Sequence, residues 1–189
     1  MREKAVRTHK IVSFMATGNE ITCGDLQNTN STHMAHLLEE CGICVGQHLA
    51  VGDSIDQLSQ GLRYLWKSHD AIIIIGGLGP TEDDLTRQAV AMSLGLPLIF
   101  DEGSWTKINK MFIKKNIALT DNNRQQALFP SGAQVIVNHQ GTANGCLIEN
   151  NGKLIFLLPG PPHECMAMFN LEVRPLLLNR HFSHQMKKF

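Results

Sequence analysis

The stretch from Asp70 to Thr86 constrains the fold of this 189-residue chain more than any other. It begins with five apolar residues, Ala71 to Ile75, of which four are β-branched isoleucines. A run this short is typical of a strand that is covered on both faces of a sheet. A glycine-rich turn, residues 76–79, follows at once, and Thr81 then precedes three acidic residues and a helical pattern. Strand, glycine turn and helix N-terminus together predict a phosphate site, because unpaired N–H groups and the helix dipole converge there.

The acidic pair Asp83 and Asp84 is unusual at a phosphate site, because a carboxylate repels an anionic ligand. Two unit charges about 4 Å apart interact by roughly 4 kcal/mol at an effective dielectric constant of about 20. A divalent metal between carboxylate and phosphate removes this repulsion, and Mg²⁺ prefers one or two carboxylates with phosphate oxygens and water. The stretch therefore predicts a metal-assisted phosphate site. A purely structural interpretation is also open, because Thr81 and Asp84 have the spacing of a capping box.

Composition excludes several other classes of function. Seventeen Lys and Arg residues balance seventeen Asp and Glu residues, so no overall basic field would hold nucleic acid or a membrane surface. No apolar run approaches the roughly 18 residues of a membrane span. The five cysteines are odd in number and scattered, which is typical of a reduced protein. We therefore expect a cytoplasmic protein with neither nucleic-acid nor membrane partners.

Alternation of strand and helix patterns predicts an α/β fold: a three-layer sandwich with a mostly parallel sheet and an antiparallel edge hairpin. We expect one domain over residues 11–180, a disordered extension over residues 1–10 and a frayed tail over residues 181–189. The helix expected from Glu82 would turn Leu85, Ala89 and Met92 inward. The expected strands are residues 11–16, 43–51, 71–75, 135–137, 146–149 and 153–158. The last helix would turn inward Cys165, Met168, Phe169 and Leu171.

Glycine or acid follows several of the expected parallel strands. The first strand leads to Gly18 and Glu20, the second to Asp53, and the last to Pro159 and Gly160. Because the carboxyl ends of parallel strands meet at one edge of a sheet, these residues should share a rim with the glycine turn. Glycine lets the backbone approach a ligand closely, and the acids can hold Mg²⁺.

Two common phosphate motifs are excluded, and some candidate residues have structural alternatives. Glu82 stands where a dinucleotide-binding fingerprint needs its third glycine, and the chain has no G-K-[ST] of a P-loop. Asp53, Asn28 and Asn30 could instead be helix N-caps. Glu20 is expected in a loop with no helix to cap, which favours a functional role.

Six ordered motifs resemble one family. The glycine turn with its acids, residues 76–86, looks like the central motif of the CinA amino-terminal domain, in the molybdopterin-binding (MoCF) superfamily. The other five motifs that are similar to those of that family are Gly18-Asn19-Glu20 with Gly24 and Asn28-Thr29-Asn30; Val51-Gly52-Asp53; Asn122-Asn123-Arg124-Gln125-Gln126-Ala127; Gly141-Thr142-Ala143-Asn144-Gly145; and Leu158-Pro159-Gly160-Pro161-Pro162-His163-Glu164. The resemblance runs from about Ile11 to Leu178. Departures include Asn19, where the family usually has Thr, and the absence after residue 189 of the carboxyl-terminal deamidase domain of full-length CinA. The resemblance therefore does not extend to deamidase activity.

The resemblance implies a molybdopterin-binding-like fold, a homo-oligomer, and functional roles for Asp84 and Asp53. In CinA-type members it implies a metal-dependent pyrophosphatase acting on ADP-ribose- or FAD-like nucleotides. In relatives that transfer adenylyl groups, it implies adenylylation of molybdopterin in the same pocket. A degenerate nucleotide-binding module without turnover is the third possibility. All three imply a small nucleotide or pterin ligand.

The resulting hypothesis is a hydrolase whose Asp84, Asp83 and Asp53 are catalytic and hold a divalent metal such as Mg²⁺. The backbone N–H groups from Gly76 to Thr81 would hold phosphate. The residues expected to bind the nucleotide or its phosphates are Gly18, Glu20, Asn28, Asn30, Gly76, Gly77, Gly79, Thr81, Asn123, Arg124, Gly141, Thr142, Ala143, Gly145, Pro159 and Gly160.

Overall fold

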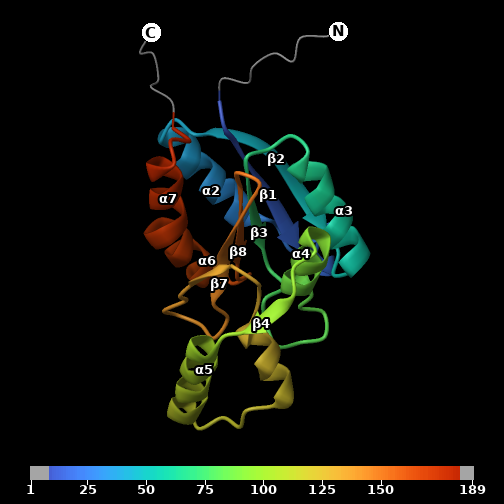
Figure 1. Ribbon diagram of the computed structural model, residues 1–189, viewed down its shortest axis with the longest axis vertical. Helices are drawn as coiled ribbons and strands as arrows, with labels where there is room; N and C mark the ends of the chain where they lie inside the picture. Colours follow the sequence, from blue (N-terminus) through green and yellow to red (C-terminus); the bar gives the residue numbers. More distant parts are fainter. Residues whose placement is uncertain (1–8, 184–189) are drawn as a thin grey trace.

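A six-stranded sheet with helices on both faces forms the body of the protein (Figure 1). The computed structural model describes residues 9–183, so most of the expected extension and most of the expected tail lie outside the described residues. The strand order is β2-β1-β3-β8-β7-β6, with parallel pairing from β2 to β8 and antiparallel pairing from β8 to β6. The six strands are β1 (Ile11–Thr17), β2 (Cys44–Val51), β3 (Ala71–Ile75), β6 (Gln134–Ile136), β7 (Gly145–Asn150) and β8 (Lys153–Leu158). The predicted mostly parallel sheet with an antiparallel edge is confirmed.

The isoleucine run is the central strand, and its neighbours explain its composition. All five residues of β3 are buried, and Ile73 lies in register between Phe14 of β1 and Phe156 of β8. Side chains that alternate along a strand point to opposite faces, so β3 supplies both halves of the core. A strand flanked by strands on both sides and by helices on both faces can be apolar throughout.

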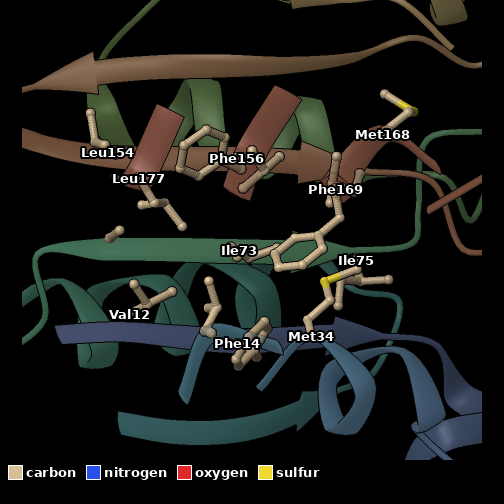
Figure 2. Packing of buried hydrophobic residues seen from close by; sticks show 14 of the residues in the cluster. Val12, Phe14, Met34, Ile73, Ile75, Leu154, Phe156, Met168, Phe169 and Leu177 are labelled. Atoms are coloured by element: carbon tan, nitrogen blue, oxygen red, sulfur yellow. The ribbon is translucent and has the colours of Figure 1, made fainter. Parts of the chain in front are cut away.

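Two apolar clusters form the core, one between the sheet and the helices on each of its faces. One contains Phe14, Ile73 and Phe156 from the sheet, packed against α2, α6 and α7 through residues such as Met34, Met168 and Leu177 (Figure 2). The other contains Met15 and Ile74, packed against α3 and α4. The helices of the body are α1 (Asn19–Thr22), α2 (Thr29–Glu40), α3 (Ile55–Trp66), α4 (Thr86–Leu94), α6 (Pro162–Met168), the π-helix η2 (Phe169–Val173) and α7 (Arg174–Asn179). The three-layer sandwich is therefore confirmed.

A smaller lobe lies beyond the end of the sheet (Figure 1). Strands β4 (Leu98–Phe100) and β5 (Leu128–Pro130) form a separate antiparallel pair. Between them run α5 (Glu102–Lys115) and the 3₁₀ helix η1 (Asp121–Ala127), which contact each other. No helix among residues 9–183 is long and apolar enough to cross a membrane.

Several local predictions were wrong, each for a structural reason. The helix expected from Glu82 begins at Thr86, because residues 81–84 form a separate turn, and Met92 is 61% exposed. Leu171 is 63% exposed because the π-helix changes the register after Met168, so Val173 is buried in its place, while Phe169 is buried as predicted. Val137 lies outside β6, and Glu20 lies in the short helix α1 rather than in a loop.

Candidate functional site

The carboxyl ends of β1, β3 and β8 surround a cavity of about 650 Å³. This is the rim that the strand ends predict, and the volume lies within the range of small-molecule sites. All but four of the predicted site residues line it. These are Gly18, Glu20, Asn28, Asn30, Asp53, Gly76, Gly77, Gly79, Thr81, Asp83, Asp84, Thr142, Ala143, Pro159 and Gly160.

The glycine turn is tied to strand β8 and to the start of helix α4. The Gly76 N–H donates to the Leu158 carbonyl of β8 (2.9 Å), and the Thr86 hydroxyl donates to the Gly76 carbonyl (2.9 Å). Gly76 has a φ of +102°, and a Cβ atom there would lie 2.8 Å from the carbonyl oxygen of Thr17. Only glycine fits this backbone without displacing β1.

Three consecutive N–H groups of the turn are available to a ligand. The N–H of Gly76 is used by β8 and that of Thr81 by Asp84, so the predicted phosphate cradle is narrower than residues 76–81. Within the described part of the chain, the N–H groups of Gly77, Leu78 and Gly79 have no hydrogen-bond partner. Successive unpaired N–H groups in a turn form a concavity that binds anions.

Asp84 stabilises a second turn, residues 81–84, which follows the glycine turn in the sequence. Its Oδ2 accepts hydrogen bonds from the N–H (2.8 Å) and the hydroxyl (2.5 Å) of Thr81. This is half of the capping pattern that the spacing predicts, but it closes a turn and does not cap α4, which begins at Thr86 after Leu85. The other oxygen of Asp84, Oδ1, accepts no hydrogen bond from the described residues, so one carboxylate can both order the turn and bind a ligand.

Asp53 bridges two strand ends. Its carboxylate accepts from the N–H of Asn19 (2.9 Å), and the Asn19 side chain accepts from the Asp53 N–H (3.2 Å). The N-cap of α3 is Ser54, so the alternative that Asp53 caps this helix is wrong. Burial raises the pKa of Asp53, the Asn19 N–H opposes this shift, and the charges of Glu20, Asp83 and Asp84 add to it.

Five carboxylates and no cationic side chain line the cavity. The carboxylates belong to Glu20, Asp53, Asp83, Asp84 and Glu164, and no Lys, Arg or His among residues 9–183 joins them. The described residues also contain no group of three or more His, Cys, Asp or Glu side chains close enough to hold a metal. A Mg²⁺ ion in this cavity would have to be held by one or two of these carboxylates, with ligand oxygens and water as its other donors.

The two predicted asparagines have different roles. Asn28 is the N-cap of α2, where its side chain accepts from the Ser31 N–H (3.2 Å), so the capping alternative is correct for this residue. Asn30 caps nothing: it is buried and donates to the Gly160 carbonyl (2.8 Å). Asn30 thus joins α2 to the end of β8 at the cavity wall.

Four predicted residues do not line the cavity. Asn123 is buried and forms a capping box with Thr120 at the start of η1. The Arg124 guanidinium lies over the rings of Phe100 and Trp105, 4.8 and 5.4 Å from their centroids. Gly141 and Gly145 are close in sequence to the lining residues Thr142 and Ala143, and Gly145 begins β7. A residue's presence in one of the six motifs therefore does not predict whether it lines the cavity or lies behind its wall.

The neighbouring glutamines, which sequence analysis did not select, do contact the site. Gln125 donates to the carbonyls of Gly79 (3.1 Å) and Thr81 (2.7 Å), and Gln126 donates to the Thr142 hydroxyl (3.2 Å). Both belong to the N-N-R-x-Q-A block, which therefore carried a signal for the site, but the prediction selected Asn123 and Arg124 from it. Glu164, in the last motif, was also missed.

Two cations, the buried Arg87 and the half-buried Lys107, bind backbone carbonyls of the cavity walls. Arg87 donates to the carbonyls of Leu78 (3.0 Å) and Asn144 (2.7 Å), and burial lowers its pKa to about 10. Lys107 donates to the carbonyls of Asn138 and Gly141 (2.9 Å for Gly141) and to Asn144 Oδ1 (2.7 Å). Neither residue has a sequence signal beyond its charge, because its partners lie on distant segments.

Comparison with known proteins identifies relatives along nearly the whole chain. Residues 13–179 match the family model described as "Probable molybdopterin binding domain". A competence-damage inducible protein of Bacillus velezensis is 42% identical over 171 residues, which are 90% of this chain and 41% of that protein. A CinA-like protein of Dictyoglomus thermophilum is 41% identical over 88% of this chain and 40% of its own length. The chain thus spans about two fifths of the length of these relatives.

Solved structures show the same fold. The crystal structure of the protein CinA from Thermoplasma acidophilum superimposes with a TM-score of 0.82 at 32% identity, covering 89% of this chain and 98% of that one. The molybdopterin biosynthesis enzyme MoaB of Thermus thermophilus superimposes with a TM-score of 0.58 at 19% identity, covering 92% and 94%. At that identity the second likeness concerns the fold alone.

Proposed function

Because this chain belongs to the family of probable molybdopterin binding domains, and within it to the CinA proteins, we propose that its cavity binds a nucleotide and hydrolyses the diphosphate linkage of ADP-ribose- or FAD-like substrates with a divalent metal. Family membership by itself supports only a small pterin or nucleotide ligand. The chemistry of the cavity supports the narrower proposal.

One observation carries the proposal: the cavity combines unpaired backbone N–H donors with five carboxylates, and no cationic side chain among residues 9–183 lines it. A diphosphate bound to N–H groups beside Asp83 and Asp84 would be repelled by them. A divalent cation reverses this, because it attracts both the carboxylates and the phosphate oxygens. The same carboxylates without a metal would oppose anion binding, so the proposed activity is metal-dependent.

The described residues then have separate roles. The N–H groups of Gly77, Leu78 and Gly79 hold one phosphate and stabilise charge that develops on its oxygens. Asp84, kept in place by Thr81, and Asp83 beside it would hold the metal. When bound, a divalent metal would neutralise phosphate charge and stabilise the leaving group.

Asp53 is suited to accept a proton from the attacking water. Its raised pKa makes it a stronger base than an ordinary aspartate, and its link to Asn19 sets its orientation. Water attacks phosphorus, its proton passes to the Asp53 carboxylate, and the bond from phosphorus to the bridging oxygen breaks. From ADP-ribose the products are AMP and ribose 5-phosphate.

The test is AMP release from ADP-ribose and FAD with Mg²⁺ or Mn²⁺, comparing the protein with Asp84→Asn. Asparagine can still accept the Thr81 hydrogen bonds, so the substitution removes charge and leaves the turn intact. Glu82→Gln is the matched control, since Glu82 is exposed and does not line the cavity. We expect activity to fall about 100-fold or more in Asp84→Asn and to stay within about twofold in Glu82→Gln. AMP release that survives in Asp84→Asn would show contamination and refute the assignment.

A second candidate follows from the family model, whose description names molybdopterin. The cavity would then bind a pterin, with or without adenylyl transfer from ATP. Binding of molybdopterin with no AMP release from any nucleotide would favour this candidate. Nucleotide binding without turnover across several metals would instead indicate a binding module.

A further inference from the structure

A second cavity, about 720 Å³, lies along α5 on the other side of the loop formed by residues 138–144. We call it the α5 groove. Its basic lining residues are Lys107, Lys110, Lys114 and Lys115, with His139 beside them, and none of its lining residues is acidic. Met111 and Val137 supply an apolar part of the lining.

The lysines are unusually concentrated for a chain with no formal net charge. α5 carries four lysines and one acid, Glu102. Lys107, Lys110 and Lys114 follow one another at helical spacing, so they share a face and repel each other. Neither ion pair found among the described residues involves them. Although the chain has no formal net charge, negative and positive side chains are separated in space: five carboxylates line the first cavity and four lysines line the α5 groove.

We propose that the α5 groove is a binding site for a small molecule that carries two or more phosphate groups. The three lysines of the stripe cover two turns of helix, roughly 10 Å along its axis, a length that matches a diphosphate or triphosphate. Bound phosphates relieve the repulsion between the ammonium groups. The apolar lining accommodates an organic group next to the phosphates, as in a nucleotide.

Size and charge favour a small ligand over a nucleic acid. The groove has the volume of a small-molecule site and extends over one helix face. A long polyanion would extend past the lysines of the groove, and among the described residues the neighbouring first cavity is lined by five carboxylates and no cationic side chain.

Lys107 couples the α5 groove to the first cavity. Its ammonium binds the carbonyl oxygens of Asn138 and Gly141 and the side chain of Asn144, while Thr142 and Ala143 of the same loop line the first cavity. A phosphate in the groove competes with these oxygens for the same protons. Ligands in the two cavities therefore influence each other through one loop, and any such coupling is reciprocal. This step alone rests on the proposed function of the first cavity.

The binding test uses inorganic tripolyphosphate, measured by titration calorimetry at low ionic strength in the presence of EDTA. Without metal, the acidic first cavity should not bind this anion. We expect Lys110→Gln with Lys114→Gln to weaken binding about tenfold, as for two partly solvated ionic contacts. The matched control is Arg63→Gln with Lys67→Gln, which removes two exposed cations at the same spacing at the end of α3 and should change the dissociation constant less than twofold.

Three outcomes would overturn the proposal: no binding of tripolyphosphate, equal weakening in both double variants, or tighter binding of a long oligonucleotide than of tripolyphosphate. Asp84→Asn separates this proposal from the previous one. It should abolish AMP release and leave tripolyphosphate binding in EDTA unchanged, so either proposal can fail without the other. Circular dichroism of each variant confirms that α5 has folded.

Discussion

Replacing Gly76 by alanine tests whether the glycine turn is as tightly held as the contacts indicate. Two costs apply. A non-glycine residue at positive φ is strained by about 1–2 kcal/mol, and the new methyl group would lie 2.6 Å from the Thr17 hydroxyl and 2.8 Å from the Thr17 carbonyl oxygen. The hydroxyl can rotate away, but the carbonyl belongs to β1, which is paired on both sides. Overpacking of this kind costs about 1–3 kcal/mol.

Gly95→Ala separates the two costs. Gly95 ends α4 with a φ of +66°, and a Cβ atom there would meet nothing within 4 Å. This variant should therefore show strain without the clash. We expect the free energy of unfolding to fall by about 3 kcal/mol in Gly76→Ala and by about 1.5 kcal/mol in Gly95→Ala. Melting temperatures should fall by roughly 6–12 °C and 3–6 °C, respectively.

Urea denaturation followed by circular dichroism measures both losses. A loss in Gly76→Ala no greater than that in Gly95→Ala would refute the argument, because it would mean that β1 yields to the methyl group. The turn would then be adaptable, and the three N–H groups proposed to hold phosphate would not be preorganised.

Three further predictions concern the ionisation of Lys107, the ionisation of Asp53, and the hydrogen bond from Asn30 to Gly160. Burial lowers the pKa of Lys107 to about 8, so between about pH 8 and 10.5 the unfolded chain binds more protons than the native one, and stability should rise with pH. In Lys107→Met, the denaturation midpoint should rise less with pH over this range than in the wild type. An equal pH dependence of the midpoint in both proteins would contradict this prediction. Burial raises the pKa of Asp53 above 3.8, so the native state binds more protons and stability falls as pH rises above that value. Asp53→Asn should remove this fall above pH 3.8 while lowering AMP release, and a variant that is less stable than the wild type at pH 7 would count against this assignment. Asn30→Ala should cost about 1–2 kcal/mol because it leaves the half-buried Gly160 carbonyl without its donor, and a melting temperature equal to that of the wild type would show that water replaces it.

Much of the fold was predictable from local pattern. The isoleucine run could be stable only as a covered strand, and it is the buried strand β3 with β1 and β8 on either side. The Asn-Gly turn at residues 151–152 joins β7 to β8 as predicted. The rim was predictable for a topological reason, because parallel strands must end at the same edge.

Local pattern failed where a residue's partner is distant in sequence. Nothing near Arg124 indicates that it stacks on Phe100 and Trp105, and nothing near Lys107 indicates that its partners lie more than thirty positions away. Spacing alone also could not show that Asp84 closes a turn before α4 begins.

The sequence by itself determined the chemistry at the strand ends: glycines where the backbone must come close, and acids where a phosphate site would need a metal. These properties are local, because they depend on residue type and on the order of strand, turn and helix. Only the tertiary structure decided which residues face the cavity and which support it from behind. It also decided that five acids line one cavity and four lysines line another in a chain with no formal net charge. The physical reason is that facing, burial and charge separation depend on contacts between segments that the chain order does not bring together.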